Sequence, residues 1–402
     1  MRLNRNILSG AMFTSTHFQR RHVSRIGRAA SIIFVLMFAG CEEKESLNKF
    51  EDFTFTGQQA SKSSSDDIGS SVRKIEVDNQ FGDVVISVSA GPSVMQWECS
   101  VWAVDESEAE RFLSQVELKQ FKTGFTETWT LNAPRGPWVV DGIKSRINIS
   151  IPPTVKVQVT NRFGNVFVSN CESTVKLDNQ NGNITVSNVS GDCEIENNYG
   201  SVEVVNATTC RVSNRFGNTN ISDVVGSLHA KNAFGQLQVN RIVGTATLEN
   251  NRGNIIASDI DGKTTATTTS ASLTVTRLSG DAHLINTRGK ISASALAGGD
   301  LRIENSFGPI YAETDARTIE CKNQNGEIEV HLTNAEFKSV QMRTQFNDLV
   351  ATVPDRITPN LNLDAGGGMI ESEFETSSAI DAPVIQLATE KGNVILKKSG
   401  LY

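Results

Sequence analysis

Apolar and polar residues alternate in short runs along most of this chain, from about residue 72 to the C-terminal end. Val202-Glu203-Val204 and Leu237-Gln238-Val239 are two such runs. A period of two is typical of β-strands that bury one side and expose the other. Glycine and asparagine, which favour turns, separate the runs. The pattern therefore predicts an all-β protein built from many short strands.

A repeat of about 18 residues organises these strands. The pattern Asn-x-x-Gly recurs with its glycines 17 to 19 residues apart, except for one double interval that Thr268–Ala271 fills. Its members are Asn161–Gly164, Asn179–Gly182, Asn197–Gly200, Asn214–Gly217, Asn232–Gly235, Asn250–Gly253, Asn286–Gly289, Asn305–Gly308 and Asn323–Gly326. A second glycine often follows nine residues later. Each repeat is therefore expected to hold two strands and two corners, where glycine adopts a positive φ without steric cost.

Apolar residues keep the same places in each repeat. After Gly182 they are Ile184, Val186, Val189, Cys193 and Ile195. A single unit of this length cannot bury its inner side, whereas stacked units can. The sequence therefore predicts a parallel β-solenoid with coils of about 18 residues.

The repeated asparagines are expected to form a structural ladder inside this stack. Five of them on consecutive coils are Asn179, Asn197, Asn214, Asn232 and Asn250. Neighbours would lie about 4.8 Å apart, so that their amides can bond to each other and to turn backbone. An asparagine-lined ligand groove is the alternative, but inward amides stacked in this way satisfy one another.

A second column, six residues after the glycine, carries alternating charge. Its members Asp223, Arg241, Asp259 and Arg277 fall on four consecutive coils. Exposed ion pairs contribute only about 0–1 kcal/mol each. The column is therefore expected to set the register of the coils, and a catalytic role is disfavoured because each carboxylate has an arginine neighbour.

The repeat is interrupted once near its start. Asn79–Gly82 begins a coil, but the next Asn-x-x-Gly arrives only at Asn161. The insertion predicts strands near 94–104, 125–131 and 143–151, and a helix opened by Asp105, with Glu108 completing a capping box. An insertion at this place is suited to cap the open end of a β-stack.

These observations predict five segments. They are a signal peptide over 1–40, a polar tether over 41–71, a first coil with its capping insertion over 72–160, a regular solenoid over 161–330, and looser coils over 331–402.

The first forty residues indicate export and lipid attachment. They hold six arginines and no acidic residue, and end in an apolar run followed by Phe38-Ala39-Gly40-Cys41. That order is typical of a secretory signal peptide, and the run is shorter than the ~20 residues that span a bilayer. The last four residues resemble the bacterial lipobox, which implies lipidation of Cys41. An ordinary signal-peptide cysteine without lipid is the alternative. We expect a cell-envelope protein, anchored to a bacterial membrane through this lipid and facing the periplasm or the exterior.

The charge of the chain limits its partners. It carries 38 basic and 45 acidic residues, a net charge of −7. Without the six leader arginines, 32 basic and 45 acidic residues remain, a net charge of −13. Nucleic-acid binding is therefore disfavoured, since it depends on neutralising phosphates.

Catalytic and cofactor chemistry find no support in the sequence. Neither a Ser/His/Asp or Cys/His constellation nor a metal-ligand cluster can be assembled from positions expected to be neighbours. We expect no enzyme activity, no metal and no cofactor. Cys193 and Cys210 occupy the same place on adjacent coils, within disulfide range. Free thiols are favoured because parallel in-register side chains suit a disulfide poorly.

One surface is a candidate for binding. The residue before each corner glycine stands outside the alternation and is often aromatic or arginine. These candidates are Phe163, Tyr199, Phe216, Phe234, Arg252, Arg288 and Phe307. Stacked in register, they would form an exposed ridge able to bind a glycan or an envelope protein. The alternative is that the aromatic rings brace the turn by stacking on one another.

The units Asn-Arg-Phe-Gly-Asn-Val and Asn-Gln-Asn-Gly-Asn-Ile, together with Ile149-Ser150-Ile151-Pro152, resemble the bacterial "putative adhesin" family of β-solenoid domains. The likeness covers about residues 72 to 400. It implies the solenoid fold and supplies no active-site residues.

Three functions remain in view. The first is a binding or adhesion scaffold at the cell envelope, which is the expectation. The second is a polysaccharide-active enzyme on a parallel β-helix, which would need unpaired carboxylates on adjacent coils. The third is a self-associating structural envelope protein, which would need uncapped ends.

Overall fold

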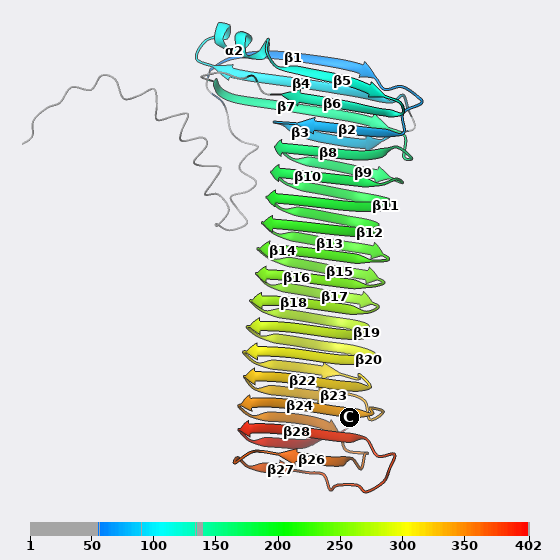
Figure 1. Ribbon diagram of the computed structural model, residues 1–402, viewed down its shortest axis with the longest axis vertical. Helices are drawn as coiled ribbons and strands as arrows, with labels where there is room; N and C mark the ends of the chain where they lie inside the picture. The colour runs from blue at the N-terminus through cyan, green and yellow to red at the C-terminus, as the bar shows by residue number, and fades with distance from the viewer. Residues whose placement is uncertain (1–54, 56, 90, 133, 135–139, 401–402) are drawn as a thin grey trace, which may run out of the picture. The chain divides into compact units, whose positions relative to one another are not determined.

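The computed structural model describes residues 55, 57–89, 91–132, 134 and 140–400. From β1 onward these residues form a parallel β-solenoid of about 11 turns, drawn in Figure 1. The predicted fold class is therefore confirmed. The predicted signal peptide and the lipidation of Cys41 lie outside the described residues.

Each turn contributes one strand to each of two parallel stacks, and the chain crosses between them at two corners. Stack I contains β2 (Lys74–Asn79), β8 (Lys156–Phe163), β10 (Val175–Asn181), the second halves of β11 (Ile184–Tyr199) and β12 (Val202–Phe216), β14 (Leu228–Phe234), β16 (Ala246–Arg252), β18 (Thr264–Ser270), the second halves of β19 (Leu273–Arg288) and β20 (Ile291–Phe307), β22 (Thr318–Asn325), β24 (Ser339–Phe346), β28 (Val384–Lys391) and β26 (Asn360–Asp364).

Stack II lies opposite. It contains β3 (Asp83–Val88), β9 (Val166–Cys171), the first halves of β11 and β12, β13 (Thr219–Val225), β15 (Leu237–Val243), β17 (Ile255–Asp261), the first halves of β19 and β20, β21 (Ile310–Thr314), β23 (Ile328–Leu332), β25 (Leu349–Pro354), β29 (Val394–Ser399) and β27 (Ile370–Ser372). The corner from stack I to stack II, which contains Asn-x-x-Gly, is called the first corner, and the return is the second corner.

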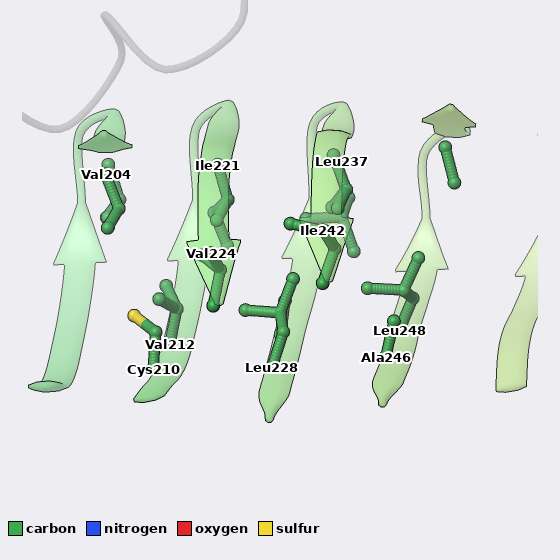
Figure 2. Close-up of a cluster of buried hydrophobic side chains, with 14 of the residues drawn as sticks. Val204, Cys210, Val212, Ile221, Val224, Leu228, Leu237, Ile242, Ala246 and Leu248 are labelled. Carbon is green, nitrogen blue, oxygen red and sulfur yellow. The ribbon is translucent and has the colours of Figure 1, made fainter. Parts of the chain in front are cut away.

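The core lies between the stacks and consists of the apolar half of the alternation. Figure 2 shows Val204, Val212 and Leu228 from neighbouring turns pointing into this space, and all three are buried. Burying such a side chain contributes roughly 1.5–3 kcal/mol. Because each turn encloses only a few of them, the core becomes continuous only through stacking.

The insertion caps the N-terminal end of the solenoid, as the sequence indicates. Strands β6 (Thr126–Asn132) and β7 (Val140–Ile151) lie parallel on β2 and β3. Antiparallel strands follow: β4 (Val94–Ala103) on β7, β1 (Gln58–Asp67) on β4, and β5 (Glu117–Thr123) on β6. Helix α2 (Glu106–Leu113) packs against β1 and β4. Asp105 is its N-cap, with the carboxylate accepting a hydrogen bond from the Glu108 backbone at 2.8 Å.

The predicted tether over 41–71 is wrong for its second half. Gln58–Asp67 forms strand β1, which pairs along its length with β4. The serine-rich composition was misleading because β1 is an edge strand whose side chains are mostly exposed on both sides. Backbone bonds to β4 hold it, and its polar side chains discourage further pairing. Strand β5, another exposed edge, was not anticipated from the sequence.

The last turns do not follow chain order. Strands β28 and β29 pair with β24 and β25 on one side and with β26 and β27 on the other. The last turn of the chain, β28 and β29, therefore lies between the turn of β24 and β25 and the turn of β26 and β27. Strands β26 and β27 form the end of the stack that is opposite the cap (Figure 1). No helix in the described part of the chain is long and apolar enough to cross a bilayer.

Candidate binding surface

The first corner places one side chain of every turn outside the solenoid. The asparagine of Asn-x-x-Gly points inward, the residue before glycine points outward, and glycine closes the corner. At Gly217, φ is 131° and a Cβ atom would lie 2.1 Å from the carbonyl oxygen of Gly200 on the preceding turn. Only glycine fits so close to the neighbouring backbone. This tight corner holds the residues before the glycines in one column, which we call the ridge.

Aromatic rings stack continuously in the middle of the ridge. The Tyr199 and Phe216 ring centroids are 4.8 Å apart with a 4° interplanar angle. Those of Phe216 and Phe234 are 4.7 Å apart with a 13° angle. The Arg252 guanidinium follows, with Cζ 5.3 Å from the Phe234 ring centroid. Arg215 also lies over the Phe216 ring, at 5.0 Å.

The other predicted ridge residues occupy the same column outside this stack. Phe163 is separated from Tyr199 by Asn181, and Arg288 pairs in register with Phe307. Tyr199, Phe163 and Phe307 are 41%, 47% and 48% exposed, so the ridge remains accessible to a partner.

Phe346, 43% exposed and under Lys391, extends the ridge but was missed in the sequence. It precedes Asn347, which replaces glycine at a φ of 124°. A search for Asn-x-x-Gly therefore passes over this turn.

The column of buried asparagines lies directly behind the ridge. The amide of Asn179 donates to the Gly182 carbonyl at 3.0 Å and to the Asn197 side chain at 3.2 Å. Asn197 bonds in the same way to Gly200 and to Asn214. The amides thus form the expected side-chain ladder in these turns, and they satisfy carbonyls that the tight corner leaves buried.

The ladder changes from Asn214 onward, which the sequence analysis did not anticipate. Asn214 donates to Thr219, a polar inward residue, and to the carbonyl of the preceding glycine corner. Asn232 and Asn250 likewise donate to the carbonyls of Gly217 and Gly235 instead of to a neighbouring amide. The change begins at the 17-residue interval, where the amide turns toward a new partner. The ladder is therefore bound mainly to backbone in this half.

A further column was overlooked because its residue types vary. The side chain after the corner glycine accepts the backbone N–H of the equivalent residue one turn on. Asn165 accepts from Asn183, and Asn183 from Ser201, at 2.9 and 2.8 Å. Together with the buried amides, these bonds hold the first corner from both sides.

The second corner is built differently. Besides the positive-φ glycines such as Gly226 and Gly244, it has a second turn residue, three positions earlier, with a φ between 53° and 60° in eight turns. These residues are Asn170, Asn188, Asn206, Asp223, Arg241, Asp259, Arg277 and Ala295. This is the left-handed region, which asparagine and aspartate tolerate best among residues other than glycine.

The predicted charge column lies at this second corner. Arg241 bonds Asp223 through two nitrogens at 2.6 and 2.7 Å, and Arg277 bonds Asp259 at 2.5 and 2.7 Å. These hydrogen bonds lower the pKa of both aspartates and raise the pKa of both arginines. The carboxylates are thus held ionised, which suits a register-setting role and not proton transfer.

A shallow groove of ≈490 Å³ runs beside these ion pairs. Its walls include Arg241, Asp259 and Arg277, and its floor includes the buried Ile242 and Ile260. Asp259 is paired with arginine, and Asp261 accepts a hydrogen bond from Ser279. Within the described residues, no group of three or more His, Cys, Asp or Glu side chains is placed to hold a metal ion.

The cysteines of the described chain are free and buried. Cys193 and Cys210 are register partners on adjacent turns. A hydrogen bond between the two thiols and burial raise the pKa of Cys193. Cys99, which the sequence did not place at an inward position, is also buried, and burial raises its pKa to about 12. None of these thiols is activated as a nucleophile.

These features define a repeat protein that offers a long, regular surface. The chain belongs to the Toastrack DUF4097 family, whose model matches residues 73–275. The resemblance to β-solenoid domains noted in the sequence is thereby confirmed.

Some solved structures that match this chain bear adhesion-related names. One is a putative cell adhesion protein from Clostridium sporogenes, 8% identical, covering 85% of this chain and 100% of that chain, with a TM-score of 0.20. Putative adhesins from Bacteroides fragilis and Parabacteroides distasonis are 13% and 16% identical, cover 85% of this chain and 97% and 98% of theirs, and have TM-scores of 0.21 and 0.18. No protein of curated function matches the sequence. At these TM-scores no function or site residue is transferred from the solved structures.

Proposed function

We propose that this protein is a cell-envelope lipoprotein that acts as a binding or adhesion scaffold, with the ridge as its contact surface. The observation that carries the proposal is the continuous stack of Tyr199, Phe216, Phe234 and Arg252 on the outside of the solenoid. Aromatic residues and arginine dominate binding energy at protein interfaces. Rings held in place by their neighbours lose little conformational entropy when a partner docks.

A catalytic role finds less support. The second-corner carboxylates are paired with arginine, and the cysteines are buried. A polysaccharide-active enzyme would need two unpaired carboxylates flanking the scissile bond. The scaffold is therefore the function that the geometry favours.

The ridge can be tested with the triple variant Phe216→Ala, Phe234→Ala, Arg252→Ala. These residues lie on three consecutive turns, and each truncation at a binding hot spot typically costs over about 1 kcal/mol. We expect most binding to be lost on glycan and envelope-protein arrays, in a variant that still folds. Phe121→Ala, an exposed aromatic residue on β5 and outside the ridge, is the matched control and should retain binding.

The brace interpretation makes a different forecast for the same variant. Stacked aromatic pairs contribute about 0.5–1.5 kcal/mol each, so a purely structural ridge would lower the melting temperature while the folded fraction still binds. Retained binding with a lowered melting temperature would contradict the proposed role of the ridge.

Membrane attachment is proposed to occur through a lipid on Cys41. The motivation is the sequence Phe38-Ala39-Gly40-Cys41 after an apolar run. Cys41→Ser should release the protein from membranes in flotation experiments, and mass spectrometry of the native protein should show an acyl adduct. A variant that still floats, beside native protein without the acyl mass, would exclude the lipid anchor.

A further inference from the structure

Two adjacent columns of outward residues on stack II carry almost no charge over eight turns, and beside them, toward the second corner, lie the charge column and the exposed Asp261. The members of the two columns are Phe167, Ser169, Thr185, Ser187, Glu203, Val205, Asn220, Ser222, Gln238, Asn240, Ile256, Ser258, Thr274, Thr276, Ser292 and Ser294. Glu203 is the charged member of this set. We call this surface the neutral face.

The outer surface of stack I contrasts with it over the same turns. There, Lys176 pairs with Glu194 at 3.1 Å, Lys231 with Glu249 at 3.3 Å, and Arg302 with Glu304 at 2.6 Å. Both surfaces belong to the same coils and have the same inward pattern. The absence of charge on the neutral face is therefore not a requirement of the fold.

Hydroxyl and amide groups dominate the neutral face, and they both donate and accept hydrogen bonds. In-register partners such as Thr274 and Ser292 lie about 4.8 Å apart along the stack, and residues two apart on one strand lie about 6.6 Å apart. The result is a regular, two-column array of small polar groups. An extended ligand with a repeating set of hydroxyls can meet such an array at many equivalent points.

Charge selects the class of ligand. The chain has a net charge of −7, so a polyanion would be repelled. The arginines at the second corner are already paired with Asp223 and Asp259, so a charged ligand would lose hydration on two columns that offer it little counter-charge, which is costly. An uncharged, hydroxyl-rich polymer meets neither penalty.

Area argues against a second copy of the chain on this face. Eight turns at the strand spacing give a length of about 34 Å, and two columns of side chains give a patch on the order of 400 Å². Stable protein interfaces bury about 800 Å² on each partner. A narrow, linear polymer fits the long patch better than a globular partner.

The ridge borders the neutral face along its length. Each ridge residue precedes an outward residue of stack II by four positions, as Phe216 precedes Asn220 and Phe234 precedes Gln238. A polymer lying along the neutral face would therefore run beside the stacked rings, which offer apolar surface to sugar rings.

We propose that the neutral face, together with the ridge beside it, binds a neutral polysaccharide that lies along the solenoid axis. The proposal rests on the scaffold function proposed above and names its ligand class. Hydrogen bonds to serine, threonine and asparagine would hold the chain of sugars, and many weak contacts would add through multivalency.

The test is affinity gel electrophoresis of the full chain in gels containing dextran, mannan, laminarin or hydroxyethyl cellulose. Polygalacturonate and heparin serve as anionic comparisons. The test variant is Thr274→Lys with Thr276→Lys, on the neutral face of β19. Its matched control is Thr265→Lys with Thr267→Lys, on β18 of stack I, where both threonines also point outward and are half-buried.

At least one neutral polysaccharide should retard the wild type and the control. The test variant should bind it about tenfold more weakly, because two hydrogen-bonding positions are lost and long charged side chains hold the polymer away. Asn220→Lys with Gln238→Lys, at two exposed positions of the neutral face, provides a second measurement if the first variant does not fold.

Three results would overturn the inference: no retardation by any neutral polysaccharide, equal binding by test and control variants, or stronger retardation by the anionic polymers. The ridge variant separates this failure from that of the scaffold function. If ridge truncation abolishes binding to an envelope protein while neutral polysaccharides do not bind, the scaffold function stands and the ligand class is wrong.

Discussion

The two corners of each turn solve the same geometrical problem in different ways. The first corner has one positive-φ position, which is glycine in nearly every turn. The second has two: one that accepts asparagine, aspartate, arginine and alanine, and, three residues later, a glycine in several turns, such as Gly226, Gly244 and Gly262. At the glycines of both corners, such as Gly217 and Gly244, a Cβ atom would overlap the backbone of the preceding turn. At the other second-corner position the side chain points to solvent, so it can vary and is used for ladders and ion pairs. Close backbone packing restricts sequence here more strongly than an unusual dihedral angle does.

The substitution with the largest expected effect on stability separates the constraint of close backbone packing from that of a positive φ. Gly217→Ala brings a Cβ atom to 2.1 Å from a carbonyl oxygen at a φ of 131°. We expect a loss of about 3–5 kcal/mol in the free energy of unfolding, from overpacking and backbone strain together.

The control is Gly298→Ala, where φ is 75° and no heavy atom lies within 4 Å of the new Cβ. Strain alone should cost about 1–2 kcal/mol there. Denaturant midpoints of both variants give the comparison, and equal losses would show that packing against the preceding turn does not distinguish the two glycines.

The loss of stability on removing a buried amide should differ by less from that on removing an exposed amide. Asn232→Ala removes a buried donor and leaves the Gly217 carbonyl without it, which costs about 1–3 kcal/mol. Asn197→Ala should cost more, since this amide bonds both a carbonyl and the next amide. Asn206, whose exposed amide bonds Asn188 at the second corner, is the matched control.

Replacing Asn206 by alanine is expected to cost at most about 1.5 kcal/mol, because water can take the place of the lost bond. Thermal melting of the three variants measures the order. An unchanged melting temperature for Asn232→Ala would refute the structural role of the buried column.

The smallest effect has the opposite sign. Ala295 holds a φ of 53° without a side-chain partner among the described contacts. Ala295→Gly relieves strain of about 1–2 kcal/mol and adds about 0.5–1 kcal/mol of unfolded-state entropy, so a gain of about 0.5 kcal/mol remains.

Arg277→Gly relieves similar strain but loses the bond to Asp259. It should therefore stabilise less than Ala295→Gly. Melting temperatures of the two variants test this order, and a destabilised Ala295→Gly would mean that strain at the second corner is negligible.

Non-local pairing decided the points that sequence analysis missed. The composition around Ser61 is typical of a linker, yet strand β1 is held by hydrogen bonds to the distant β4. The spacing of glycines cannot show that β28 is inserted between β24 and β26, because both orders use the same local corners. The partner of the Asn232 amide depends on the exact positions of the neighbouring turns, because acceptors from several turns lie within hydrogen-bond distance of it.

By itself, the sequence determined the solenoid, its period, its inward residues, the Asn-x-x-Gly corners and the helix capped by Asp105. These follow from local alternation, from backbone sterics at glycine and from a capping signal within a few residues, all of which are written in short stretches of chain. Only the tertiary structure decided which ridge rings touch, which amides bond to backbone, and that two outer columns of stack II are neutral while the outer surface of stack I carries ion pairs. Those properties arise between turns about 18 residues apart, where the stacking register, and no local preference, determines which side chains meet.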